Sequence, residues 1–114
     1  MSDFDTLVRL LRRWTHNHDP HVREAVELLI WHETWIRRAD FQRACIELGG
    51  REAYINWRKA REFTDSGSRA STSEMAVLDL AVALGEDRYR FSIMGSAHSR
   101  MIATMVARAL GEDR

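Results

Sequence analysis

The longest run of apolar positions at helical spacing extends from Val22 to Ala39 and reads VREAVELLIWHETWIRRA. At about 100° per residue, its apolar side chains cover most of the helix circumference and leave only a narrow polar strip. A helix with so wide an apolar arc is normally surrounded by other elements of the fold. The pattern therefore predicts a central buried helix over residues 22–39, with a break or bend near Ala39 and Asp40.

Five further segments repeat apolar residues at intervals of three and four, the spacing of an amphipathic helix. They cover residues 3–14, 41–48, 51–63, 74–84 and 97–110. Ser71 and Glu74 have the Ser-x-x-Glu spacing of a capping box, and Pro20 stands where the central helix begins. Gly85 and Gly111 follow two of the segments, as residues that end helices do.

Single polar residues are predicted to cap the remaining helix starts. They are Ser2 or Asp3, Asp19, Asp40 and Ser96. The hexapeptide ALGEDR occurs at 83–88 and again at 109–114. Shared helix-ending chemistry accounts for most of this repetition, and a duplication would account for it as well.

The segments at 41–48 and 51–63 are separated only by Gly49 and Gly50, which predicts a tight αα-hairpin. The alternating residues between 86 and 95 resemble a short strand, but no partner strand is evident for them. We therefore expect one all-α domain over residues 1–114, an orthogonal bundle of five or six helices. Its one long exposed loop is expected at residues 64–72.

Charge and cysteine content narrow the classes of function. The 17 basic and 17 acidic residues cancel, so no overall field draws the chain to nucleic acid or anionic lipid. Cys45 is the only cysteine, which excludes a disulfide framework and a cysteine-based zinc site. There is no signal-peptide pattern at the start and no apolar run of roughly 20 residues, so a cytoplasmic location without membrane contact is expected.

A cluster of imidazole and carboxylate side chains precedes the central helix, at His16, His18, Asp19 and His21. These residue types bind zinc and nickel, but their spacing matches no pattern that fixes a tetrahedral site. We therefore expect neither a metal nor another cofactor.

The pair His32 and Glu33 lies inside the apolar arc of the central helix. A zinc protease helix needs His-Glu-x-x-His, and Ile36 stands where the second histidine would be. Glu33 is predicted to be buried and held by Arg37 or by an indole N–H. The alternative is a buried carboxyl with a raised pKa that serves as a general acid or base.

The predicted hairpin over residues 37–61 carries seven basic residues against three acidic ones. Its second helix combines guanidinium groups with aromatic rings, the residue types of interface hot spots. The partner-binding candidates are Arg51, Tyr54, Trp57, Arg58 and Arg61. The same chemistry suits phosphates and bases, although ordinary solvated helix faces look similar and nearby glutamates would repel phosphate.

The segment SRASTSEMAVLDLAVAL, followed by a helix that ends in ARALG, resembles a pattern in small uncharacterised helical proteins of actinobacteria and their phages. The resemblance covers about the last 45 residues. The Arg-rich, Lys-poor composition agrees with such a source. The resemblance implies no activity and no catalytic residues.

The leading interpretation is a small non-catalytic protein-interaction module, such as a phage or plasmid accessory protein that binds a host protein. Four Trp and five Met, with two helices apolar nearly all round, exceed what one small core can enclose. A homodimer would also cover this surplus of apolar residues. The alternative is a nucleic-acid-binding regulator that uses the 37–61 hairpin, and an enzyme based on His32 and Glu33 is the third interpretation.

Overall fold

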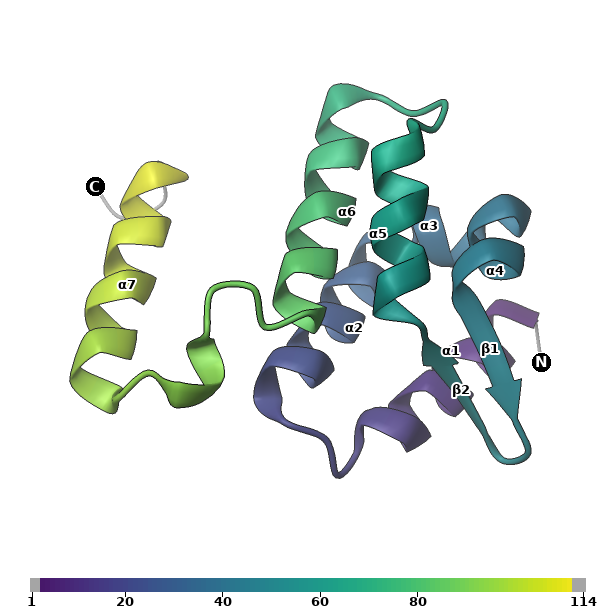
Figure 1. Cartoon of the computed structure of the whole chain (residues 1–114), viewed down its shortest axis with the longest axis horizontal. Helices are drawn as coiled ribbons and strands as arrows, with labels where there is room; N and C mark the ends of the chain where they lie inside the picture. Colours follow the sequence, from purple (N-terminus) through teal and green to yellow (C-terminus); the bar gives the residue numbers. More distant parts are fainter. Residues whose placement is uncertain (1–2, 112–114) are drawn as a thin grey trace.

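A computed structural model describes residues 3–111 (Figure 1). The predicted cap Ser2 and the last three residues of the ALGEDR repeat lie outside this range. The described chain is mostly helical, with seven α-helices, one two-stranded sheet and one 3-10 turn. The elements are α1 (Asp3–Thr15), α2 (Pro20–His32), α3 (Thr34–Arg37), α4 (Ala39–Cys45), β1 (Ile46–Gly49), β2 (Glu52–Ile55), α5 (Trp57–Ser66), α6 (Thr72–Gly85), η1 (Phe91–Ile93) and α7 (Ser96–Ala109). The mainly helical class is confirmed, but the chain is not purely helical.

The predicted central helix is divided into α2 and α3, and it breaks earlier than expected. Glu33 interrupts it with φ 67° and ψ −38°, and Arg38 follows α3 in an extended conformation. Trp31 and Trp35, four residues apart, would share one face of a continuous helix. The break places them in different surroundings, so that Trp31 is 79% exposed whereas Trp35 is fully buried.

The predicted αα-hairpin is wrong, since a β-hairpin occupies its centre. Strands β1 and β2 pair antiparallel, with Ile46 opposite Ile55 and Gly49 opposite Glu52. The two-residue turn begins at Gly50, whose φ of 67° is the conformation that glycine adopts at low cost. The basic segment over residues 37–61 is therefore not a helical hairpin.

The core forms where α2 and α6 pack together, with α1, α4, α5 and the hairpin around them. Its largest fully buried side chain, Trp35, donates its indole N–H to the carbonyl of Glu74 at 2.9 Å. The rings of Phe41 and Phe63 pack against Trp35 and against each other. A buried indole with an acceptor stabilises the fold without leaving a polar group unpaired.

Helix α6 begins with the predicted capping box. The Ser71 hydroxyl accepts from the Glu74 backbone N–H at 3.1 Å, and the Glu74 carboxylate accepts from the Ser71 backbone N–H at 2.8 Å. Pro20 also begins α2 as predicted. Asp19 and Ser96, by contrast, make no side-chain cap, since Asp19 lies beside the His21 ring and Gly95 precedes the first turn of α7.

The predicted loop at 64–72 is shorter than expected because α5 continues to Ser66. The remaining segment is held to the body by Arg38. Its guanidinium donates to the Arg69 carbonyl at 2.8 Å and to the Ser68 hydroxyl at 2.9 Å. The same guanidinium binds both carboxylate oxygens of Asp40. One arginine therefore joins the connection before α6 to the start of α4.

Candidate interaction surface

The C-terminal part of the chain stands apart from the folded body. We call residues 86–110 the C-terminal arm, which comprises the connection after α6, the η1 turn and α7. Figure 1 shows α7 on the side of α6 opposite to α5, joined to the body only through this connection. None of the residues of α7 from Ser96 to Ala109 is buried. Helix α7 therefore has apolar side chains that the core of the same chain does not cover.

Large exposed apolar side chains concentrate on and beside this arm. Of the nine such residues within the described chain, seven lie between positions 80 and 110. They are Leu80, Tyr89, Ile93, Met101, Met105, Val106 and Leu110. Exposed apolar residues scattered singly are ordinary, whereas a contiguous group marks a site of association.

A groove of about 500 Å³ runs between η1 and α7. Both large and small apolar side chains line it. The lining residues are Phe91, Met94, Ser99, Ile102, Ala103, Val106, Ala107 and Leu110. A groove lined by apolar side chains suits the apolar face of a helix from another molecule.

The connection that carries the arm is ordered by its own hydrogen bonds. The Asp87 carboxylate accepts from both the backbone N–H and the hydroxyl of Ser92. The hydrogen bonds from Ser92 hold the pKa of Asp87 below its ordinary value. Asp87 and Arg90 both take positive φ, at 55° and 58°, so the chain turns sharply twice. These contacts fix η1 beside α2 and direct α7 outward.

The five residues predicted to bind a partner do not form one helix face. Arg51 and Tyr54 lie on the β-hairpin, whereas Trp57, Arg58 and Arg61 lie on α5. The indole of Trp57 packs inward against Gly85. Their role in binding a partner stays a prediction, but their geometry differs from the expected one.

Arg61 is engaged within the fold. Its guanidinium contacts Asp79 at 2.7 Å and Glu86 at 3.0 Å, with its side chain 19% exposed. The hydrogen bonds to Glu86 and Asp79 raise the pKa of Arg61. Arg58, on the same helix, is exposed and forms no ion pair among residues 3–111. Of the two, only Arg58 is available to a partner without breaking existing contacts.

The structure instead brings Arg51 and Tyr54 beside the end of α1. Arg13 donates to the Arg51 carbonyl at 3.2 Å, and the rings of Trp14 and Tyr54 lie 6.0 Å apart. The His18 ring packs edge-on against Trp14. The guanidinium groups of Arg13 and Arg51 form no ion pair with any carboxylate in the described chain. Residues far apart in the sequence thus form a small basic and aromatic face.

Glu33 is not buried, so the buried-acid prediction is wrong in that respect. Its side chain is 50% exposed, because the backbone turns outward where α2 ends. The predicted contact with Arg37 is present at 2.9 Å. The neighbouring His32 is half-buried, and its Nδ1 has no hydrogen-bond partner among the described residues. The two side chains therefore do not combine into an acid–base pair.

The histidine cluster is separated by the fold. His18 packs on Trp14, whereas His21 donates from Nδ1 to the Leu84 carbonyl at 2.9 Å. No group of three or more His, Cys, Asp or Glu side chains within residues 3–111 is arranged to hold a metal ion. His21 lines a pocket of about 550 Å³, but Ser92 in that pocket is bound to Asp87 rather than to the imidazole. The hydroxyl and the imidazole in this pocket are therefore not paired with each other.

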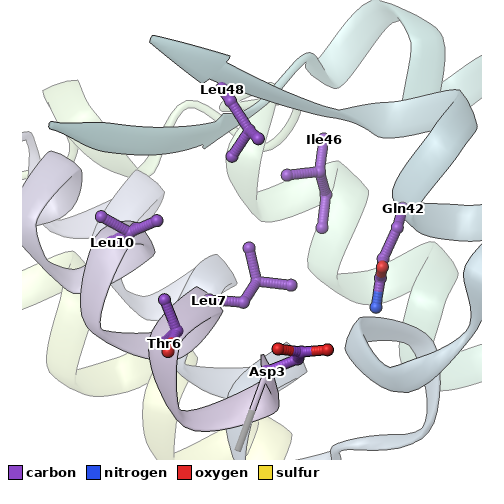
Figure 2. A pocket seen from close by; sticks show the side chains of 7 residues that line it. All are labelled: Asp3, Thr6, Leu7, Leu10, Gln42, Ile46 and Leu48. Carbon is purple, nitrogen blue, oxygen red and sulfur yellow. The ribbon is translucent and has the colours of Figure 1, made fainter. Parts of the chain in front are cut away.

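A third hollow, of about 270 Å³, lies between α1 and β1 (Figure 2). The side chains of Leu7, Ile46 and Leu48 reach into it, with the Asp3 carboxylate at its edge. Gln42 directs its amide N–H to the Ile36 carbonyl at 2.7 Å, so this group is already occupied. The lining holds a single carboxylate and no histidine, cysteine or basic residue. It is an apolar depression without the paired groups of acid–base chemistry.

The comparisons with known proteins give no family for the chain. No protein-family model matches it, and no curated protein or solved structure is significantly similar to it. No helix within the described residues is long and apolar enough to cross a membrane.

Proposed function

We propose that this protein is a non-catalytic interaction module and that its C-terminal arm is the working surface. The observation that carries this proposal is the concentration of exposed apolar side chains on the arm, with Met101, Met105 and Val106 on the uncovered helix α7 and Ile93 and Leu110 on either side of it. Methionine is flexible and polarisable, so it adapts to the apolar face of a partner. The proposed partner is a protein, and a phage or plasmid accessory role that targets a host protein fits this mode of action.

The composition of the middle of α7 also supports a protein rather than nucleic acid as the partner of the arm. Between Arg100 and Arg108 the helix carries no charged residue. Interface cores are likewise depleted of charge and enriched in methionine and aromatic residues. The groove beside η1 provides the concave part of such an interface.

The test is capture of a host protein by wild-type protein and by the double variant Met101→Gln/Met105→Gln. Glutamine keeps the chain length and helix propensity of methionine but removes its apolar character. We expect the variant to lose capture at least tenfold, with circular dichroism unchanged. The control is Leu48→Gln, which removes an even more exposed apolar side chain from the β-hairpin. Equal capture by all three proteins would exclude the arm as the working surface.

The basic and aromatic face at the end of α1 favours a second candidate function, nucleic-acid binding. Arg13, which donates to the Arg51 carbonyl, and Arg51 form no ion pair within residues 3–111, and the rings of Trp14 and Tyr54 belong to the same face. This set replaces the helical hairpin as the site that such a function would use. Binding to random DNA should then weaken steeply with salt, and Arg13→Gln/Arg51→Gln should reduce both affinity and salt dependence. The control Arg58→Gln should retain both, and binding equal in all three proteins would exclude this face.

A further inference from the structure

We infer that the arm docks on helix α6 of a second copy of this chain, so that two copies exchange arms in a symmetric dimer. The inference rests on the proposed function, because it names the occupant of the same apolar surface. Two-fold symmetry is the commonest arrangement of homo-oligomers, and each contact is then made twice.

The receiving face is the outer side of α6. The sequence pattern predicts that α6 is buried nearly all round, yet only one side of it is covered. Leu78 and Val82 face the core, whereas Ala76 is exposed and Leu80 is 47% exposed. Ala76 and Leu80 are one helical turn apart, so they form a short apolar stripe. The small side chain of Ala76 leaves space beside the large side chain of Leu80, and a side chain of another helix can pack into that space.

Charge complementarity selects α6 as the surface that α7 meets. Helix α6 contains the acidic residues Glu74 and Asp79 and no basic residue. Glu74 also caps the helix and Asp79 also contacts Arg61 of α5, but the Asp79 side chain is still 58% exposed. Helix α7 contains His98, Arg100 and Arg108 and no acidic residue. Opposite charges at the edges of an apolar contact steer association and fix its register. Two copies of α7 pressed together would instead bring like charges close.

The ordered connection keeps the arm from covering the α6 of its own chain. The carboxylate of Asp87 binds Ser92, and His21 is bound to the Leu84 carbonyl. The positive φ values of Asp87 and Arg90 set the direction in which the chain leaves α6. Figure 1 shows α7 held clear of α6 by this connection. The matching surface within reach is therefore that of another molecule.

Cross-linking between single-cysteine variants tests this contact. The native Cys45 is fully buried, so an introduced thiol is the only reactive one in the folded protein. Leu80→Cys protein is mixed with Met105→Cys protein and oxidised at micromolar concentration. We expect a disulfide-linked pair containing one chain of each variant, at a yield several times that of either variant alone. The control pairs Arg58→Cys with Met105→Cys, because Arg58 is exposed on α5.

Sedimentation of the wild-type protein completes the test. A dimer is expected, and Met101→Gln/Met105→Gln should sediment as a monomer. Cross-links no more frequent than in the Arg58→Cys control would overturn the inference. So would a disulfide that forms within one chain of Leu80→Cys/Met105→Cys at high dilution, since α7 would then fold onto its own α6. A monomeric wild-type protein that still captures a host protein through the arm would overturn the dimer and leave the proposed function standing.

Discussion

The indole of Trp57 lies directly against the backbone of Gly85, so the first turn of α5 approaches the last turn of α6 closely. A Cβ atom at position 85 would come within 2.4 Å of Cδ2 and Cε2 of Trp57. Real side-chain contacts are essentially never that short. Gly85 is buried and lies within α6 rather than beyond its end. This glycine is therefore required by packing between two helices.

Gly85→Ala is expected to destabilise the fold by about 1–3 kcal/mol, because the methyl group would overlap the indole. In a helix without such a neighbour, the same change normally stabilises by about 0.5–1 kcal/mol. Urea denaturation measures the difference. The matched control is Gly95→Ala, where an added Cβ meets nothing within 4 Å. A denaturation midpoint unchanged by Gly85→Ala would show that Trp57 does not pack there.

Glu33→Gly is expected to stabilise the protein by about 1 kcal/mol. The backbone at Glu33 has φ 67°, which costs a residue with a side chain roughly 1–2 kcal/mol. The lost contact with Arg37 is half-exposed and contributes about 0.5 kcal/mol or less. Thermal denaturation of Glu33→Gly and Glu33→Ala separates the two effects, since alanine removes the ion pair but keeps the strain. A lower melting temperature for the glycine variant than for the alanine variant would refute the break at this residue.

Asp40 is expected to contribute to acid denaturation. Hydrogen bonds from Arg38 lower the pKa of Asp40 below its ordinary value of 3.8. The unfolded chain therefore binds a proton more readily, so this contribution is complete above that value and disappears as the pH falls through the lowered pKa. Asp40→Asn should lose less stability than wild type between about pH 5 and about pH 3. The contribution is below about 1 kcal/mol, because the Asp40 side chain is 41% exposed.

The control for this comparison is Asp65→Asn. Asp65 is exposed and forms no ion pair among residues 3–111. Urea midpoints of the three proteins at both pH values give the result. Identical acid sensitivity of Asp40→Asn and wild type would show that Arg38 does not stabilise the Asp40 carboxylate.

The Cys45 thiol is expected to resist alkylation in the folded protein. Burial raises the pKa of Cys45 to about 12, so the reactive thiolate is scarce at pH 8. Reaction with iodoacetamide should be at least a hundredfold slower in native protein than in urea. Mass spectrometry measures both rates. Comparable rates would place Cys45 at the surface and would also require its replacement before the cross-linking experiment.

Much of the helical fold could be predicted from the sequence, because caps and apolar periodicity are local signals. Ser71, Glu74 and Pro20 start their helices as predicted. The β-hairpin was missed because each strand has only four residues and its apolar positions also fit a helix. The alternation in Ile46-Glu47-Leu48 and Ala53-Tyr54-Ile55 around Gly50 was the available signal.

The candidate site could not be predicted from periodicity alone. The apolar face of α7 resembles that of a core helix, and only the fold distinguishes a covered face from an uncovered one. The repeat ALGEDR illustrates the same limit. Gly111 has φ 81° after the end of α7, whereas Gly85 lies inside α6 beneath Trp57. The same short sequence thus has different structural roles at its two positions, because the tertiary neighbours differ.

Amide hydrogen exchange across α7 tests most directly the claim that the arm is an uncovered docking helix. In dilute protein, amides of residues 96–109 should exchange much faster than those of residues 20–32, because α7 opens locally without disturbing the core. Their protection should increase as the concentration of protein or captured partner rises, and it should not increase in Met101→Gln/Met105→Gln. Protection of α7 equal to that of α2 at the lowest concentration would contradict the account, since the arm would then be packed within its own chain.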